Sequence, residues 1–279
     1  MTAEAEPNPP APVAPPPIAP PIVLIHGMWS TPAAFAGLRR RLEAAGYTTH
    51  APALPFHDRA PDAPPPAELG ALGLEDYIAF LANEIAALPG PVIVAGHSLG
   101  GFLAQAVAAR VGAAGLMLFA PAATAATSVP GLAPLRTMAR VVTRNGWWRQ
   151  PTKIDAASAR WGIYNEVPAE IAEAEIAALV WDSGRVLYEM ALPFLAKAPA
   201  FAVDYARLTM PALVVVGGRD RITPAAIARA TARRLVQVDY EELPHVGHWL
   251  WWGEVEARVG EVAVAWLARH FPPTLWDAP

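Results

Sequence analysis

The sequence predicts an α/β protein with a doubly wound, mostly parallel sheet of about six strands, helices on both faces and a helical cap insertion. Two observations support this prediction. Short apolar runs rich in β-branched residues alternate with helix-like segments, which is typical of parallel strands joined by crossover helices. Between residues 121 and 205 the alternation stops and helical pieces replace it, so this segment, the insertion, is expected to leave the sheet.

The chain enters the expected sheet at residues 22–25, Ile-Val-Leu-Ile, a run typical of a buried strand. Thr31 is placed to cap a helix with Pro32 at its first position, and Gly46 is placed to end it. A second strand is expected over residues 47–54. This order of strand, helix and strand indicates the start of a parallel sheet.

The alternation continues up to the insertion. Leucines and isoleucines recur at helical spacing over residues 74–88, which predicts an amphipathic helix. Residues 91–95 and 116–119 are apolar runs of strand length, and residues 98–110 between them read as a helix. These segments are expected to form the centre of the sheet, covered on both faces.

After the insertion the pattern returns. Residues 213–216 predict a fifth strand, and Thr223-Pro224 is placed to open the next helix. A sixth strand is expected over residues 236–240 and a final helix over residues 254–270. Together these segments complete a sheet of six strands.

Three parts of the chain are therefore expected. Residues 1–21 are dense in proline and should form a disordered tail. Residues 22–120 and 206–279 should form the α/β core. Residues 121–205 should form a helical cap over the carboxyl edge of the sheet, where open α/β sheets bind ligands.

Composition excludes several classes of protein. The 279 residues include no cysteine, which rules out disulfides, thiol catalysis and cysteine-bound metal sites. With a net charge of −4, the chain lacks the excess of basic residues that is typical of nucleic-acid-binding proteins. The apolar share is 54%, yet prolines and glycines interrupt the long apolar stretch 85–135, so no membrane span is expected. Because no export signal is visible, the expected location is cytoplasmic.

The motif with the clearest chemistry is Gly96-His97-Ser98-Leu99-Gly100, a G-x-S-x-G sequence between an expected strand and an expected helix. In this setting the motif makes a sharp turn that exposes a nucleophilic serine. Side chains two residues either side would collide, which explains the glycines, and the helix N-terminus favours developing negative charge. The alternative is a glycine-rich turn that serves packing alone.

With these residues the chain resembles the α/β-hydrolase superfamily over about residues 22–271, apart from the insertion. His26-Gly27 after the first strand and the loops around Asp220 and His248 also carry the resemblance. The order Ser, acid, His is the one that this fold uses. The resemblance implies Ser98 as nucleophile, Asp220 as triad acid and His248 as base. No hairpin precedes His26-Gly27, so six parallel strands are expected rather than eight.

A serine hydroxyl needs a neighbouring base, and the base needs an orienting carboxylate. His248 lies in the Gly-His-Trp context after the last expected strand, and His245 is its rival. Two imidazoles without a third ligand do not favour a metal site, so no metal is expected. Asp220 follows an apolar strand and precedes a capped helix, whereas Asp204 and Asp239 fit the position of the acid less well.

Acyl transfer also needs an oxyanion hole of two backbone N–H groups. The resemblance implies Leu99 for one and Met28 for the other, with Trp29 as the alternative to Met28. Trp29, His97 and Trp249 are expected in the substrate pocket. Tryptophans in the insertion either line the pocket or pack the insertion onto the sheet: Trp147, Trp148, Trp161 and Trp181. His57-Asp58 in the proline-rich loop is interpreted as a solvated turn, with a position facing the site as the alternative.

The sequence therefore predicts a serine hydrolase that cleaves small to medium apolar carboxylic esters through an acyl-enzyme intermediate, without a cofactor. Its partner would be a small apolar ester, and the oligomeric state is left open. A lactonase and a carbon–carbon bond hydrolase would use the same triad. A ligand receptor without turnover is the alternative from another class, since a fold does not determine a function. The serine in place of aspartate argues against dehalogenases and epoxide hydrolases.

Overall fold

Six parallel strands form the central sheet, as the sequence predicts. The computed structural model describes residues 19–129 and 131–273, so the expected tail lies outside it except for residues 19–21. The strand order is β2-β1-β3-β4-β7-β8, and every neighbouring pair is parallel. The strands are β1 (Ile22–Ile25), β2 (Thr49–His50), β3 (Ile93–His97), β4 (Gly115–Phe119), β7 (Pro211–Gly217) and β8 (Gln237–Leu243).

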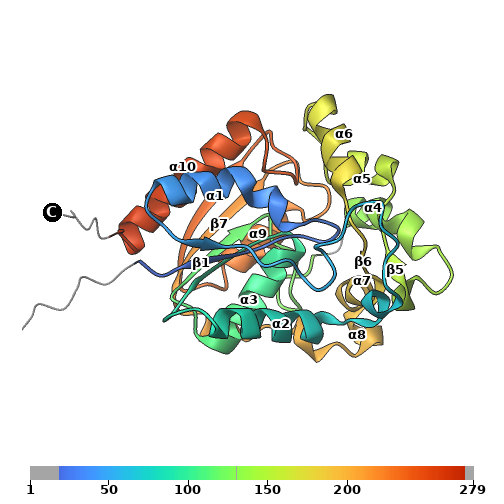
Figure 1. The fold of residues 1–279 in the computed structure, drawn as a ribbon, viewed down its shortest axis with the longest axis horizontal. Helices are drawn as coiled ribbons and strands as arrows, with labels where there is room; N and C mark the ends of the chain where they lie inside the picture. Colours follow the sequence, from blue (N-terminus) through green and yellow to red (C-terminus); the bar gives the residue numbers. More distant parts are fainter. Residues whose placement is uncertain (1–18, 130, 274–279) are drawn as a thin grey trace, which may run out of the picture.

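Helices cover both faces of this sheet, which makes it doubly wound (Figure 1). α1 (Ala36–Ala44) and α10 (Gly253–His270) pack together on one face. α2 (Leu74–Ala86) and α3 (Leu99–Val111) pack together on the other, and α9 (Ala225–Ala232) follows β7. Short 3₁₀ helices join the larger elements: η1 (Pro32–Phe35), η2 (Ala67–Ala71), η3 (Trp147–Arg149), η4 (Pro199–Phe201) and η5 (Tyr205–Arg207).

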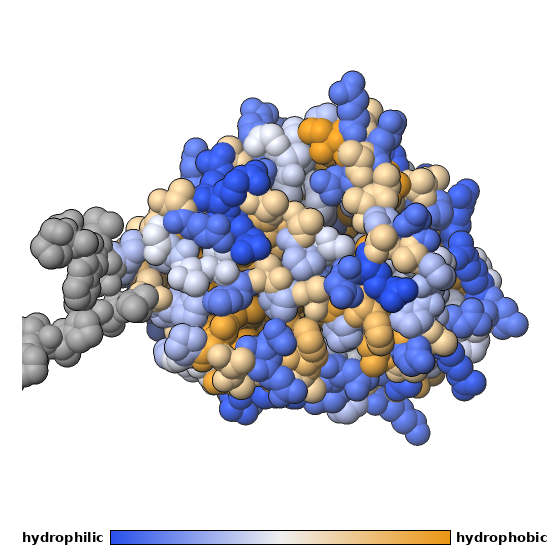
Figure 2. Space-filling model, viewed as in Figure 1, coloured by the Kyte–Doolittle hydropathy of each residue, from blue (hydrophilic) through white to orange (hydrophobic). Residues whose placement is uncertain are grey.

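The central strands are buried on both faces. All residues of β1, β3 and β4 are buried, which explains why these strands are continuous apolar runs rather than alternating ones. Many apolar residues of the chain fill this core, and the face in Figure 2 shows hydrophilic residues interspersed with apolar ones. No helix within residues 19–129 and 131–273 is long and apolar enough to cross a membrane.

The insertion lies beside the carboxyl end of the sheet, toward which β1 runs (Figure 1). Its helices are α4 (Leu132–Val142), α5 (Ala156–Gly162), α6 (Ala169–Ala178), α7 (Gly184–Ala191) and α8 (Pro193–Ala196). Two short strands, β5 (Pro151–Thr152) and β6 (Asp182–Ser183), pair antiparallel within it. This small sheet was not expected from the sequence.

The second strand is much shorter than the expected 47–54. β2 contains only Thr49 and His50, and it lies at the edge of the sheet. Pro52 has no backbone N–H to donate, so the ladder cannot continue through it. The chain instead leaves the edge and forms the proline-rich loop that contains His57.

Candidate active site

Ser98 occupies a strained turn at the end of β3. Its backbone has φ 57° and ψ −121°, which is unfavourable for a residue with a side chain. A side chain at Gly96 would collide with the backbone of Gly100, and one at Gly100 would collide with the carbonyl of Ile25. The two glycines therefore allow the tight turn that places a half-buried serine at the N-terminus of α3.

His248 and Asp220 meet at the same edge of the sheet. Asp220 follows β7 and His248 follows β8, and His248 Nδ1–H donates to Asp220 Oδ2 over 2.7 Å. Asp220 Oδ1 accepts the backbone N–H groups of Ile222 and Thr223, each at 2.8 Å. The carboxylate is thus held rigidly against the imidazole. With Nδ1 committed, Nε2 is the nitrogen of His248 that is left to exchange a proton.

His245 occupies a different environment. It is exposed, and its Nδ1 accepts from Arg219 Nη2 over 3.2 Å, because a guanidinium can only donate. Arg219 also pairs with Glu166 at 2.9 Å. By contrast His248 is 2% exposed. Of the two rival histidines, only His248 lies beside Asp220.

His97 supports the backbone at His248. His97 Nε2–H donates to the carbonyl of His248 over 3.1 Å, and the two rings lie 4.7 Å apart. Burial, with the nearby His248 charge, lowers the pKa of His97 well below its usual range, so the ring stays neutral. Trp249 packs edge-to-face against the same ring, with the ring centroids 5.7 Å apart.

A cavity of about 320 Å³ lies between the sheet edge and the insertion. Asp220 lies behind His248 and does not line the cavity. All other expected site residues line it: Met28, Trp29, His97, Ser98, Leu99, His248 and Trp249. The insertion contributes an apolar wall that includes Leu135, Met138, Val142, Ile163, Leu179, Leu187, Met190 and Phe201. The structure therefore brings the expected residues together at one cavity.

The four tryptophans of the insertion do not line this cavity. Trp147 is buried against Trp148 and Tyr188. Trp161 carries the guanidinium of Arg136 over its ring at 4.1 Å and contacts that of Arg221 at 4.9 Å. The pocket interpretation therefore fits none of the four, and Trp161 alone among them contacts a described core residue, Arg221, through its ring.

Two backbone N–H groups beside Ser98 have no hydrogen-bond acceptor among the described residues. Leu99 is the first residue of α3, so its N–H has no partner within the helix. In the loop after β1, residues 26–30 (the β1 loop), the N–H of Trp29 donates to Asp182 Oδ2 over 3.0 Å. Among the described residues, the N–H of Met28 has no hydrogen-bond acceptor. Met28, not Trp29, thus has an N–H free for a ligand.

The interpretation of His57-Asp58 as a solvated turn is wrong for His57. Its side chain is fully buried, and Nε2 lies 3.1 Å from Asp182 Oδ2 as an ion pair. Its other nitrogen, Nδ1, donates to the carbonyl of Pro55 over 3.0 Å. No local sequence signal indicates this pairing, since Asp182 belongs to the distant insertion.

The His57–Asp182 pair predicts a pH-dependent stability. Burial alone would lower the pKa of His57, but the charge of Asp182 and the hydrogen bonds outweigh it and raise the pKa above 6.5. Burial would raise the pKa of Asp182, but the His57 charge and the donors around it lower it below 3.8. His26 and Tyr77 also face the His57 ring. Asp182 and His57 are therefore both charged between pH 3.8 and pH 6.5.

The stabilisation that the charged His57 adds to the unfolding free energy is complete below pH 6.5 and is lost as the pH rises through the raised pKa of His57. That of Asp182 is complete above pH 3.8 and is lost as pH falls through its lowered pKa. Relative to a neutral His57→Gln/Asp182→Asn variant, the unfolding free energy of the wild type should therefore fall above pH 6.5, by at most about 1.4 kcal/mol per pH unit. Urea unfolding from about pH 5 to about pH 9 measures this trend; a difference independent of pH would contradict the ion pair.

The model of the alpha/beta hydrolase family matches residues 22–263. A pyrethroid hydrolase of Sphingobium wenxiniae is 35% identical over 117 residues, which are 40% of this chain and 38% of that protein. The match therefore spans less than half the length of this relative.

Solved structures share the fold over most of the chain. A monoacylglycerol lipase of Paleococcus ferrophilus superposes with a TM-score of 0.64 at 20% identity, covering 91% of this chain and 97% of that one. A pyrethroid hydrolase from Sphingobium faniae JZ-2 superposes with a TM-score of 0.61 at 24% identity, covering 90% and 97%. At these identities the likeness shows the fold alone.

Proposed function

The chain belongs to the alpha/beta hydrolase family, and on that premise we propose that it is a serine hydrolase of small to medium apolar carboxylic esters. One observation carries the proposal. Ser98, in a strained turn, faces the same apolar cavity as His248, whose Nδ1 is bonded to the buried Asp220. Nucleophile, base and orienting carboxylate are the three parts that activate a hydroxyl for acyl transfer.

In the proposed reaction Ser98 Oγ attacks the ester carbonyl while His248 Nε2 accepts the hydroxyl proton. His248 then gives this proton to the leaving alcohol, and the acyl group remains on Ser98. Water, deprotonated by His248, attacks the acyl-enzyme; the acid departs and Ser98 regains its proton. Asp220 keeps His248 in the required tautomer and stabilises its charged form in each half of the reaction.

The negative charge on the carbonyl oxygen would be met by the N–H groups of Leu99 and Met28. Both residues line the cavity beside Ser98. The occupied N–H of Trp29 favours Met28 over Trp29 for this role. Removal of one such donor typically costs about 2.7–4 kcal/mol of transition-state stabilisation.

The cavity supports an uncharged, apolar substrate. None of the described residues that line it is Asp, Glu, Lys or Arg. Residues 121–205 supply much of the wall, which supports their role as a cap over the core segments 22–120 and 206–279. The relative from Sphingobium wenxiniae is a pyrethroid hydrolase, which agrees with a hydrolase function. No step of the reaction calls for a metal or cofactor.

Hydrolysis of p-nitrophenyl esters from acetyl to dodecanoyl tests the proposal. We expect turnover with a kcat/KM maximum at intermediate chain length, because a cavity of about 320 Å³ is too small to enclose a dodecanoyl chain together with the p-nitrophenyl group. The matched control is an acyl chain of optimal length that ends in a carboxylate, which should react much more slowly. A preference for the charged ester would contradict the substrate class.

Absence of turnover would be informative if a fluorophosphonate still labels Ser98. The nucleophile would then be active on another substrate, and lactones and carbon–carbon substrates would be tested next. A folded protein that binds an ester but neither turns it over nor reacts at Ser98 would instead be a receptor.

A further inference from the structure

The insertion holds the β1 loop through Trp29 by three hydrogen bonds. The N–H of Trp29 donates to Asp182 Oδ2 over 3.0 Å, and its carbonyl accepts the N–H of Val180 over 2.8 Å. Its indole N–H donates to the carbonyl of Thr152 over 3.1 Å. Trp29 has φ 59°, a left-handed conformation that a bulky residue adopts only when its surroundings enforce it. The insertion supplies those surroundings.

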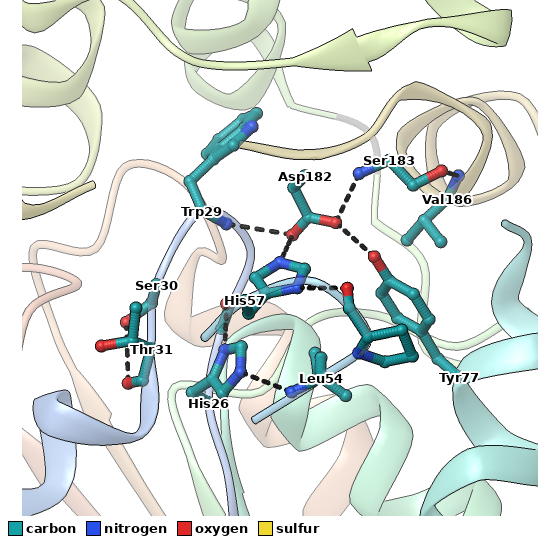
Figure 3. A network of polar contacts seen from close by, with 12 residues as sticks. His26, Trp29, Ser30, Thr31, Leu54, His57, Tyr77, Asp182, Ser183 and Val186 are labelled. Carbon is teal, nitrogen blue, oxygen red and sulfur yellow. Dashed lines mark hydrogen bonds and ion pairs between the residues drawn. The ribbon is translucent and has the colours of Figure 1, made fainter. Parts of the chain in front are cut away.

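Asp182 is the best-connected of these anchors (Figure 3). Its Oδ1 accepts the Tyr77 hydroxyl over 2.8 Å and the backbone N–H of Ser183 over 2.6 Å. Its Oδ2 accepts the N–H of Trp29 and pairs with His57 Nε2 at 3.1 Å. The carboxyl group is fully buried, and three hydrogen-bond donors and the ion-pair partner His57 converge on its two oxygens. Only a carboxylate suits these four neighbours, because an amide nitrogen in place of either oxygen would face at least one hydrogen-bond donor.

The other side of the β1 loop is held by His26. Its Nδ1–H donates to the carbonyl of Gly27 over 2.9 Å, and its Nε2 accepts the N–H of Leu54 over 3.1 Å. Burial, with the nearby His57 charge, lowers the pKa of His26 to about 3, so the ring is the neutral tautomer that this pattern requires. The carbonyl of Gly27 belongs to the same peptide unit as the N–H of Met28.

The peptide that carries the Met28 N–H is therefore anchored on both sides. His26 holds its carbonyl oxygen, and Asp182 holds the N–H of the next peptide, at Trp29. Rotation of the Met28 peptide away from Ser98 would break one of these hydrogen bonds. Since preorganised donors stabilise an oxyanion because they need not reorient, this anchoring has a direct catalytic consequence.

We propose that Asp182, supported by His57 and Tyr77, is a positioning residue that holds the Met28 N–H in the oxyanion hole from the insertion. This inference rests on the proposed function. Asp182 does not touch the substrate; it acts through the backbone of Trp29. The insertion is then a part of the catalytic machinery as well as a wall of the pocket.

The test compares Asp182→Asn with Glu189→Gln. Glu189 is also a nearly buried carboxylate of the insertion, and its Oε2 accepts the N–H of Leu74 over 2.7 Å, away from the β1 loop. Both variants thus weaken a contact between the insertion and the core. A second variant, His57→Gln/Asp182→Asn, removes both charges of the pair and so leaves no unpaired charge in the core. It tests the role of Asp182 if Asp182→Asn fails to fold.

With p-nitrophenyl butanoate we expect Asp182→Asn or the double variant to lose about 100-fold in kcat, with little change in KM. Glu189→Gln should stay within a few-fold of wild type at similar thermal stability. Phosphonylation of Ser98 by a fluorophosphonate, which also builds charge on oxygen, should slow in parallel with kcat. Affinity for a trifluoromethyl ketone, which forms a tetrahedral adduct with Ser98, should fall by the same factor. Affinity for the ether analogue of the substrate ester, which cannot react with Ser98, should not change.

Equal losses in Asp182→Asn and Glu189→Gln, or a loss confined to KM, would overturn the positioning role. If the wild type hydrolyses no ester but Ser98 is labelled, the proposed substrate class fails, while the labelling rates of the variants still decide the inference. If Ser98 of the folded wild type is inert to the fluorophosphonate, both proposals fall.

Discussion

Replacement of Ser98 with alanine is expected to reduce kcat on p-nitrophenyl esters by about 10⁶-fold. Without the hydroxyl no acyl-enzyme can form, and His248 and Asp220 have no nucleophile to activate. Stability should change little, because the side chain of Ser98 makes no hydrogen bond to the described residues and is only half-buried. The measurement is steady-state hydrolysis with thermal unfolding of both proteins.

Ser128→Ala is the matched control for this prediction. Ser128 also lines the cavity, but it belongs to the insertion and not to the turn after β3. It should keep most of the wild-type activity and its fluorophosphonate label. A Ser98→Ala variant that hydrolyses esters within tenfold of wild type would show that the reaction uses another nucleophile, and the proposed mechanism would be wrong.

Replacement of His248 with alanine is expected to cost a similar factor, about 10⁶-fold in kcat. His248 is the imidazole that lies at the cavity with its Nδ1 on Asp220, so its loss removes the group that takes the serine proton. His245→Ala should change kcat only a few-fold, because His245 is exposed and bonded to Arg219. Activity of the two variants on one ester gives the ranking directly.

Folding must be controlled in this experiment, because His248→Ala removes the imidazole donor from the buried carboxylate of Asp220. A His248→Gln variant keeps a side-chain amide near Asp220 but cannot act as a base, and it should be equally inactive. If His245→Ala is the inactive variant and His248→Ala is not, the assignment of the base must be reversed.

Most of the fold could be predicted from the sequence. Buried parallel strands are continuous apolar runs, and glycine, proline and threonine mark the turns and helix starts between them. The expected second strand was too long because its apolar residues suggested a strand through Pro52, where the ladder has no donor to continue. The small sheet of β5 and β6 was missed since a pair of two-residue strands has no periodicity of its own.

The candidate triad was also accessible from the sequence, because each member follows a strand and parallel strands end at the same edge of the sheet. Ser98 has a local signature in the glycines that its turn requires. His57, Tyr77 and Asp182 have no such signature, and the sequence pattern around His57 predicts a solvated turn. Their contacts join the loop after β2, the start of α2 and the insertion.

By itself, the sequence determined the elements that local sterics and burial impose: the strained turn at Ser98, the order of the strands and helices, and the loops that carry Asp220 and His248. Only the tertiary structure decided how residues 121–205 pack beside the carboxyl edge of the central sheet. The docking of the insertion places Asp182 against Trp29, buries His57 and leaves the Met28 N–H open. The reason is physical: these contacts join residues far apart in the chain, so their energies depend on packing that no local pattern encodes.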